Sequence, residues 1–247
     1  MRLDRRKMLL YAVTDSSWTD KLCLIDQVEA ALDNGATCLQ FRDKQLEDRQ
    51  FLDQACSIKR ICNKYNVPFI VNNNVSAAVE CGADGIHIGQ DDMNPADVRK
   101  IAGDDMIIGV STHSVDEALR AVQDGADYLG LGAVFGSSTK ADTTGMSLQT
   151  LHAICGAVDI PTVAIGGISA ENIYLLRGSG IDGIAVISAI FSADDPGKAT
   201  AEIFELAKET VYLDSGKPGA PLFVAQKNKR CRLKGDFNEN SIINRRK

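Results

Sequence analysis

The sequence predicts one α/β domain, a single (β/α)8 TIM barrel over residues 1–213, followed by a basic, irregular extension over residues 214–247. Three observations predict the barrel. The chain has 247 residues, the usual length for one such barrel. Short apolar runs recur along it, each followed by a stretch with helical spacing. A glycine turn also repeats before every second run.

Eight apolar runs are candidate strands. They are rich in Val, Ile and Leu and lack polar alternation, as expected for parallel strands that are buried on both faces. The runs cover residues 8–13, 38–41, 69–71, 85–88, 107–110, 128–131, 162–165 and 183–187.

A repeated turn precedes the second, fourth, sixth and eighth runs. Its four copies are Gly35-Ala36-Thr37, Gly82-Ala83-Asp84, Gly125-Ala126-Asp127 and Gly180-Ile181-Asp182. Glycine can adopt the left-handed conformation that ends a helix, and a short loop then leads into the next strand. The repetition favours a closed barrel, and a doubly wound open sheet, which uses the same loops, is the alternative.

Capping patterns mark two of the intervening helices. Ser114 is a candidate N-cap with Glu117 three residues on, and Asp195-Pro196 opens a last helix that reaches about Val211. After Asp214 the periodicity ends, so the barrel is expected to end near Leu213 and the extension 214–247 has no predicted domain.

Composition narrows the partners and the compartment. The net charge is −6, and because the extension carries nine Lys or Arg against three acids, the barrel itself is strongly acidic, which argues against nucleic-acid binding. The seven cysteines include no C-x-x-C pair and indicate reduced thiols and a cytoplasmic protein. No run approaches the roughly 20 apolar residues of a membrane span, so no membrane partner is expected.

Polar residues after the second run suggest an anion site, because catalytic groups of such barrels stand at the C-terminal ends of strands. Gln40, Arg42 and Lys44 alternate along an extended segment and therefore point to the same side. Two cations and an amide donor there would clamp a diphosphate and neutralise charge on a leaving phosphate. A solvated charged loop is the alternative for Arg42 and Lys44.

Oxygen-bearing side chains follow the third and fourth runs. Asn72 and Asn73 end the third, and Asp91 and Asp92 follow the fourth. Mg²⁺ takes one or two carboxylates together with substrate phosphates, so Asp92 with Asn73 or Asp91 could hold this ion. Turn chemistry or helix capping would equally account for these residues.

Three later segments suit phosphate groups. Ser137, Thr139 and Lys140 lie in a loop of small residues after the sixth run, which lacks a Walker pattern. Gly166-Gly167 and Ile187-Ser188 follow the seventh and eighth runs, where backbone amides and a helix N-terminus hold phosphate in many barrels.

Neither His87 nor His113 is assigned a catalytic role, since a strand histidine is more often a hydrogen-bonded structural group. Ser111 has no evident Ser-His-Asp partners, which argues against hydrolysis by a serine nucleophile.

Taken in order, these segments resemble those of the thiamine-phosphate synthase family over most of the barrel. The matching segments are Gln40-x-Arg42-x-Lys44, Asn72, His87-Ile88-Gly89-Gln90-Asp91-Asp92, Gly109-Val110-Ser111, Ser137-Ser138-Thr139-Lys140, Ala164-Ile165-Gly166-Gly167-Ile168 and Ile187-Ser188-Ala189-Ile190. One position departs from the family pattern, because Asn73 stands where the family normally has an Asp ligand to magnesium.

The resemblance implies an enzyme that uses Mg²⁺ to join hydroxymethylpyrimidine diphosphate to a thiazole phosphate. It assigns the pyrimidine diphosphate to Gln40, Arg42, Lys44, Asn72, Ser111 and Lys140, of which Arg42, Lys44, Ser111 and Lys140 act in catalysis. It assigns the thiazole phosphate to Ser137, Thr139, Gly167, Ile187 and Ser188, and the metal to Asp92 and Asn73. We expect Lys140→Ala to lower turnover by about 100-fold or more, measured in steady-state assays.

Two other functions remain open from the sequence. A thiazole tautomerase of the same fold would transfer a proton, commonly through a histidine such as His113. A non-catalytic protein that binds the thiazole phosphate is the second alternative, and it rests on the loss of the acid at Asn73. The partners expected in each case are small phosphorylated molecules. Whether the chain forms a homo-oligomer is left open.

Overall fold

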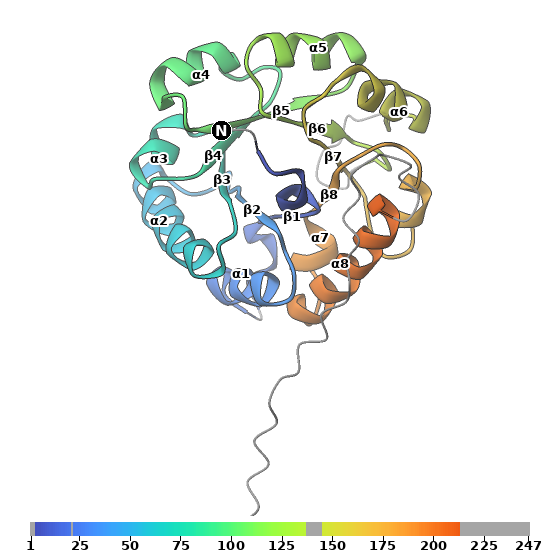
Figure 1. The fold of residues 1–247 in the computed structure, drawn as a ribbon. Helices are drawn as coiled ribbons and strands as arrows, with labels where there is room; N and C mark the ends of the chain where they lie inside the picture. Colours follow the sequence, from blue (N-terminus) through green and yellow to red (C-terminus); the bar gives the residue numbers. More distant parts are fainter. Residues whose placement is uncertain (1–2, 21, 137–144, 213–247) are drawn as a thin grey trace, which may run out of the picture. The chain divides into compact units, whose positions relative to one another are not determined.

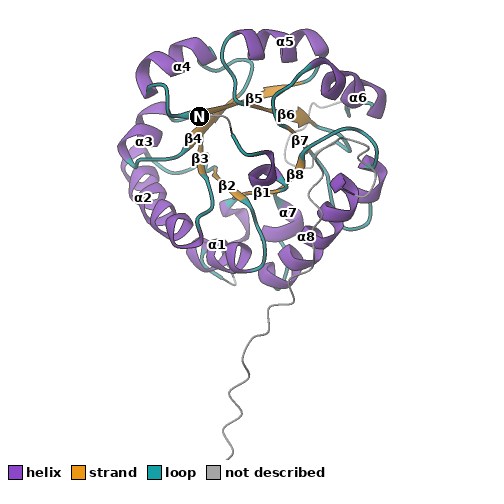
Figure 2. Ribbon diagram, viewed as in Figure 1, coloured by secondary structure: helices purple, strands orange, loops and turns teal. Residues whose placement is uncertain are grey.

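The computed structural model describes residues 3–20, 22–136 and 145–212. Eight parallel strands pair in chain order, and the last pairs with the first to close a barrel. Figure 1 shows the helices as an outer ring around these strands, and Figure 2 shows the same two layers by type of element. The predicted (β/α)8 barrel is confirmed, and the open sheet is excluded by the pairing of β1 with β8.

The strands lie close to the predicted runs. They are β1 Leu10–Val13, β2 Cys38–Phe41, β3 Phe69–Asn72, β4 Gly85–Ile88, β5 Ile107–Thr112, β6 Tyr128–Gly132, β7 Thr162–Ile165 and β8 Gly183–Val186. β1 begins later than predicted, because residues before it form a 3-10 helix, η1 (Arg5–Met8), whose N-cap Asp4 accepts a hydrogen bond from the amide of Arg6. β5 runs further than predicted, so Ser111 lies within the strand.

The helices connect these strands on the outside. They are α1 Leu24–Asp33, α2 Asp48–Tyr65, α3 Val75–Glu80, α4 Pro95–Ala102, α5 Val115–Gln123, α6 Leu148–Ala157, α7 Ser188–Phe191 and α8 Pro196–Tyr212, with 3-10 helices η2 Ser16–Trp18 and η3 Ile173–Leu176. The predicted cap of α5 is confirmed, since the Ser114 hydroxyl accepts from the amide of Glu117 at 3.2 Å. α8 matches the predicted last helix, and residues 213–247 lie outside the described residues, so the predicted boundary near Leu213 stays a prediction.

Two apolar cores result from the two faces of the strands. The larger lies between the strands and the helices, with residues such as Leu39, Ile86 and Leu129. The smaller fills the barrel interior and includes Tyr11 and Tyr128. Burial on both faces explains why the strands lack polar alternation along most of their length.

The four repeated turns join neighbouring strands at the N-terminal end of the barrel. Their glycines all have positive φ, at 113°, 66°, 95° and 88° for Gly35, Gly82, Gly125 and Gly180. The last residue of each turn bonds twice to the start of the preceding strand. Its amide donates to the carbonyl of one strand residue, and its side chain accepts from the amide of that strand residue. The four pairs of turn and strand residues are Thr37 with Leu10, Asp84 with Phe69, Asp127 with Ile108 and Asp182 with Thr162.

A cation pairs with each of the three turn carboxylates. Lys59 lies 2.7 Å from Asp84, and Arg99 lies 2.8 Å from Asp127. Arg5 of η1 lies 2.6 Å from Asp182, and its guanidinium also donates to the carbonyl of Asp159 before β7. The two contacts of Arg5 hold η1 against the N-terminal end of the barrel, so the opposite end is left for a binding site.

No helix in the described ranges has both the length and the apolar character needed to cross a membrane.

Candidate active site

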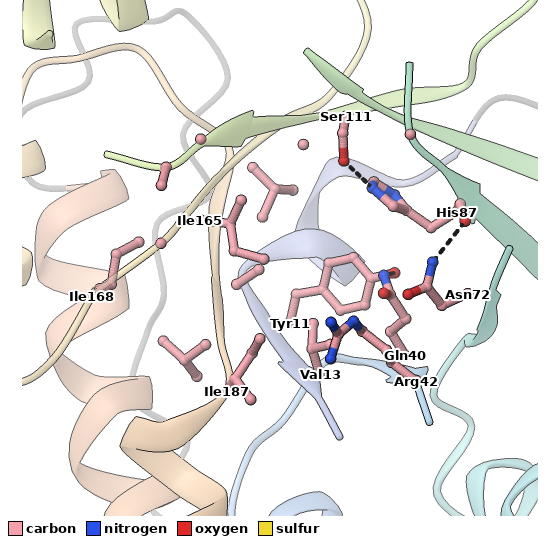
Figure 3. A pocket seen from close by; sticks show the side chains of 18 of the residues that line it. Tyr11, Val13, Gln40, Arg42, Asn72, His87, Ser111, Ile165, Ile168 and Ile187 are labelled. Carbon is pink, nitrogen blue, oxygen red and sulfur yellow. Dashed lines mark hydrogen bonds between the residues drawn. The ribbon is translucent and has the colours of Figure 1, made fainter. Parts of the chain in front are cut away.

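A cavity of about 250 Å³ opens at the C-terminal ends of the strands. Its walls come from every strand of the barrel or from the loop that follows the strand. Figure 3 shows that polar side chains from β2 to β5 occupy one side and that Ile165, Ile168 and Ile187 occupy the other. The cavity therefore offers one charged and hydrogen-bonding wall and one apolar wall to a ligand.

The cationic part of the polar wall follows β2. The hydroxyl of Thr14 bonds to both backbone groups of Arg42. It accepts from the Arg42 amide at 3.0 Å and donates to the Arg42 carbonyl at 3.2 Å. Its guanidinium lies 3.9 Å from a carboxylate oxygen of Asp15, and its side chain is only 18% exposed. Arg42 is thus oriented before a ligand arrives, whereas Lys44 is exposed at the rim.

Oxygen donors lie on the next two strands. The Asn72 side-chain amide donates to the side-chain oxygen of Asn73 and to the carbonyl of His87. One Asp92 carboxylate oxygen accepts from the amide of Gly89 at 2.7 Å. Asn73 and Asp92 both line the cavity, whereas Asp91 lies outside that lining. Within the described residues, no three His, Cys, Asp or Glu side chains gather around one point.

Ser111 lies deeper, within β5. Its hydroxyl is 2.9 Å from Nε2 of His87, and its carbonyl accepts from the Gln90 side chain at 2.6 Å. Nδ1 of His87 is 2.9 Å from the Tyr128 hydroxyl, which supports the structural role predicted for this histidine. His113 lies at the cavity with Nδ1 3.1 Å from Glu117, a contact that the sequence did not indicate.

The loop after β7 presents glycine backbone to the cavity. Gly166 and Gly167 have φ of 106° and 65°, and a Cβ on Gly167 would lie 2.6 Å from the carbonyl oxygen of Gly136. The Asn172 side chain donates to the Gly167 carbonyl at 2.8 Å, and its oxygen accepts from the Ser169 amide at 2.8 Å. A side chain at Gly167 is therefore excluded both by its backbone conformation and by the nearby chain.

The structure brings together all the described residues that the sequence assigned to the site. Those that line the cavity are Gln40, Arg42, Lys44, Asn72, Asn73, Asp92, Ser111, Gly167, Ile187 and Ser188. Ser137, Thr139 and Lys140 lie outside the described residues.

Residues 10–190 match the family model described as thiamine monophosphate synthase. The chain belongs to the thiamine monophosphate synthase family. The match covers the barrel from β1 into α7 and therefore includes every predicted site residue.

Named relatives of this family are similar over nearly their whole length. The thiamine-phosphate synthase of Ruminiclostridium cellulolyticum is 46% identical over 197 residues, which cover 80% of this chain and 94% of the relative. The thiamine-phosphate synthase of Clostridium tetani is 45% identical over 194 residues, 78% of this chain and 93% of the relative.

A solved structure agrees with the sequence comparison. The thiamine phosphate pyrophosphorylase of Pyrococcus furiosus superposes with a TM-score of 0.78 at 37% identity, covering 84% of this chain and 98% of that one. A 3-hexulose-6-phosphate synthase superposes with a TM-score of 0.60 at 15% identity and shares the fold.

Two buried tyrosines of this family member were not expected at the site. Tyr11 and Tyr128 form the floor of the cavity, with hydroxyls 2.8 Å apart. In the sequence they stand inside apolar runs and look like core residues. The available signal was chemical, because a buried tyrosine hydroxyl needs a hydrogen-bond partner.

Proposed function

We propose that this protein is a thiamine-phosphate synthase, a transferase of thiamine biosynthesis. It joins hydroxymethylpyrimidine diphosphate to hydroxyethylthiazole phosphate and releases diphosphate and thiamine monophosphate. Beyond the family match, one observation carries the proposal: Arg42 and Lys44 share a cavity with the oxygen donors of Asn73 and Asp92. That combination suits a diphosphate better than any uncharged ligand.

The chemistry needs neither a base nor a nucleophile from the protein. The bond between the exocyclic carbon and the diphosphate oxygen breaks, and the electron pair leaves with the diphosphate. The aminopyrimidine ring spreads the resulting positive charge, and the lone pair of the thiazole nitrogen forms the new C–N bond. Catalysis then depends on stabilising the leaving group and on holding the two rings together.

The polar wall is assigned to the pyrimidine diphosphate. Arg42 and Lys44, with Lys140, which lies outside the described residues, neutralise the charge that grows on the leaving oxygens. Gln40, Asn72 and Ser111 supply neutral hydrogen-bonding groups on the same wall. Arg42 is suited to this role because Thr14 holds its backbone on both sides, so little reorganisation is needed.

The residues present fit a magnesium ion that is shared with the substrate. Mg²⁺ is usually held by one or two carboxylates together with phosphate oxygens and water, rather than by a cage of protein ligands. Asp92 and the side-chain oxygen of Asn73 would hold it beside the diphosphate. Bound there, Mg²⁺ would act as a Lewis acid on the leaving group.

The opposite wall is assigned to the thiazole phosphate. Ile165, Ile168 and Ile187 offer apolar surface for the ring, and Gly167 and Ser188 also line the cavity. The backbone amides of such segments commonly hold phosphate in barrels of this type. Ser137 and Thr139 complete this assignment from outside the described residues.

The decisive experiment supplies both substrates and Mg²⁺ to the purified protein. Thiamine monophosphate and diphosphate are expected in equal amounts, and both are measured by chromatography. Absence of both products would refute the proposal.

The thiazole tautomerase is the second candidate, because His113 lies at the cavity beside Glu117 at 3.1 Å. Such an enzyme would need no diphosphate clamp. Exchange of thiazole phosphate protons into deuterated water, without pyrimidine diphosphate, would identify that activity. A His113→Gln variant that keeps full synthase activity would assign His113 no part in the condensation.

The proposed compartment is the cytoplasm. Its support is the state of the cysteines in the described part of the chain, where Cys23, Cys38, Cys56, Cys62, Cys81 and Cys155 are all free thiols. Free thiols are typical of reducing compartments.

A further inference from the structure

A chain of hydrogen bonds crosses the floor of the cavity from Gln40 to Ser111. The Gln40 side-chain nitrogen donates to the Tyr11 hydroxyl at 2.8 Å, and that hydroxyl lies 2.8 Å from the Tyr128 hydroxyl. The Tyr128 hydroxyl lies 2.9 Å from Nδ1 of His87, and Nε2 of His87 lies 2.9 Å from Ser111 Oγ. Two residues assigned to the same substrate are therefore connected through three side chains that the proposed mechanism does not use.

The packing around this chain leaves its members little freedom. Tyr11 and Tyr128 are 2% and 0% exposed, and their rings meet edge to face with centroids 5.9 Å apart. A Cβ on Gly109 would lie 2.0 Å from the Tyr128 ring, and a Cβ on Gly130 would lie 3.0 Å from the His87 ring. The two glycines therefore make the space that the Tyr128 and His87 rings occupy.

One set of hydrogen-bond directions is consistent along the whole chain from Gln40 to His87. An amide nitrogen only donates, so Tyr11 accepts from Gln40, and in this set of directions Tyr11 gives its own hydrogen to Tyr128. Burial raises the pKa of both tyrosines well above 10, so each keeps its hydroxyl hydrogen at neutral pH. Tyr128 in turn donates to Nδ1 of His87, and a neutral imidazole that accepts at Nδ1 carries its hydrogen on Nε2.

The Ser111 end requires the same direction. Diphosphate oxygens only accept hydrogen bonds, so Ser111 must donate to bind them. If Ser111 Oγ accepts from His87 Nε2, its own hydrogen is free to turn toward the ligand. The opposite tautomer would take that hydrogen and leave a serine lone pair facing an anion.

We propose that His87 is a positioning residue: Tyr128 sets its Nε2–H tautomer, and His87 thereby fixes the Ser111 hydroxyl as a donor to the substrate diphosphate. The inference rests on the proposed function, because the anionic substrate is what makes the direction matter. It gives Tyr128 and His87 an effect on one substrate through Ser111.

The tautomer can be measured without substrate. The chain has only three histidines, so His113→Gln and His152→Gln variants assign the ring ¹⁵N signals of His87. In the wild-type protein at neutral pH, the expected pattern is a protonated Nε2 and a bare, hydrogen-bonded Nδ1. In Tyr128→Phe, the Nδ1 signal should move toward that of an unbonded nitrogen. A protonated Nδ1 in the wild-type protein would overturn the proposal.

Kinetics test the effect on Ser111. Tyr128→Phe should lower kcat/KM for the pyrimidine diphosphate by about fivefold or more and leave KM for the thiazole phosphate within about twofold. In a Ser111→Ala background, the same change should cost less than about twofold, because the group it positions is gone. Tyr174→Phe is the matched control, since it removes a hydroxyl from a residue that is 52% exposed.

An equal loss in both backgrounds, or an equal effect on both substrates, would show that Tyr128 acts only through the fold. The melting temperature of each variant is measured alongside. If the wild-type protein forms no thiamine monophosphate, the proposed function fails, whereas the ¹⁵N pattern still decides whether His87 holds the inferred tautomer.

Discussion

Asn73 shows how one side chain can combine a backbone role with a proposed ligand role. Its φ is 61°, in the left-handed region that Asn and Asp adopt more readily than other side chains. Its side-chain oxygen accepts from Asn72, a bond that a carboxylate at this position could also accept. Asn73 therefore suits the local backbone as well as an Asp would, and it differs from an Asp only in lacking the formal negative charge.

Asn73→Asp is expected to tighten Mg²⁺ binding, because it adds a negative charge to a site that otherwise has Asp92. The Mg²⁺ concentration at half-maximal rate should fall by about threefold or more. Titration of activity with Mg²⁺ measures it, and Asn74→Asp serves as the control one residue away. An unchanged or weaker Mg²⁺ dependence would place Asn73 outside the metal shell.

Arg42→Ala is expected to lower kcat by about 100-fold or more, because it removes a pre-oriented charge next to the leaving diphosphate. Arg42→Lys should recover only part of this loss, since lysine lacks the planar fork of donors. Arg49→Ala is the matched control, because Arg49 is exposed on α2 and lies outside the cavity lining. A loss below about threefold for Arg42→Ala would remove Arg42 from the mechanism.

Among the helices and strands, the four glycine turns link neighbouring strands in pairs through hydrogen bonds, and we call these paired bonds clamps. The residue after each Gly-Ala or Gly-Ile step bonds in both directions to the start of the preceding strand. Such clamps tie β1 to β2, β3 to β4, β5 to β6 and β7 to β8. The turn thus fixes the pairing of two strands, and at Gly35, Gly82 and Gly125 it also follows closely on the end of a helix.

Asp127→Ala is expected to lower the free energy of unfolding by about 2 kcal/mol, because it leaves the Ile108 amide and the Arg99 guanidinium without their shared partner. Urea unfolding measures the change. Asp97→Ala is the control, since its pair with Lys100 is exposed and should contribute no more than about 0.5 kcal/mol. Equal losses in the two variants would show that the Asp127 contacts do not stabilise the barrel.

For the molecule as a whole, the burial of thiol and tyrosine hydroxyl groups makes the free energy of unfolding depend on pH in the alkaline range. Burial raises the pKa of the Cys62 thiol from 9.0 to about 12, and it raises the pKa of Tyr11 and Tyr128 well above 10. A group whose pKa is raised by folding holds its proton more tightly in the folded state. The contribution of such a group to the free energy of unfolding is fully present below its pKa in the unfolded chain. That contribution is lost as pH rises toward its pKa in the folded protein.

The free energy of unfolding should therefore begin to fall as pH rises above 9, where Cys62 first ionises in the unfolded chain. Cys62→Ala should reduce that slope by up to about 1.4 kcal/mol per pH unit, although it lowers stability at neutral pH by creating a cavity. Urea unfolding at a series of pH values measures both. An unchanged slope in Cys62→Ala would contradict the shift assigned to this thiol.

Patterns in the sequence predicted the architecture and most of the proposed site. Continuous apolar runs located the strands, because strands that are buried on both faces leave no alternation. The residues directly after those runs located the cavity lining, because the C-terminal ends of parallel strands meet at one end of a barrel. Local patterns sufficed for the strands and for the residues just after them, whereas Ser111 entered the predicted site through the resemblance to the family.

The contacts between buried side chains are visible only in the folded barrel. Tyr11, His87 and Tyr128 stand in three separate apolar runs, and nothing in those runs indicates hydroxyls and ring nitrogens within 2.9 Å. The clamps of Asp84, Asp127 and Asp182 were likewise visible only as repeated turns, without their partners Lys59, Arg99 and Arg5. These contacts depend on the closure and register of the barrel, which join residues far apart in the chain and leave no local pattern.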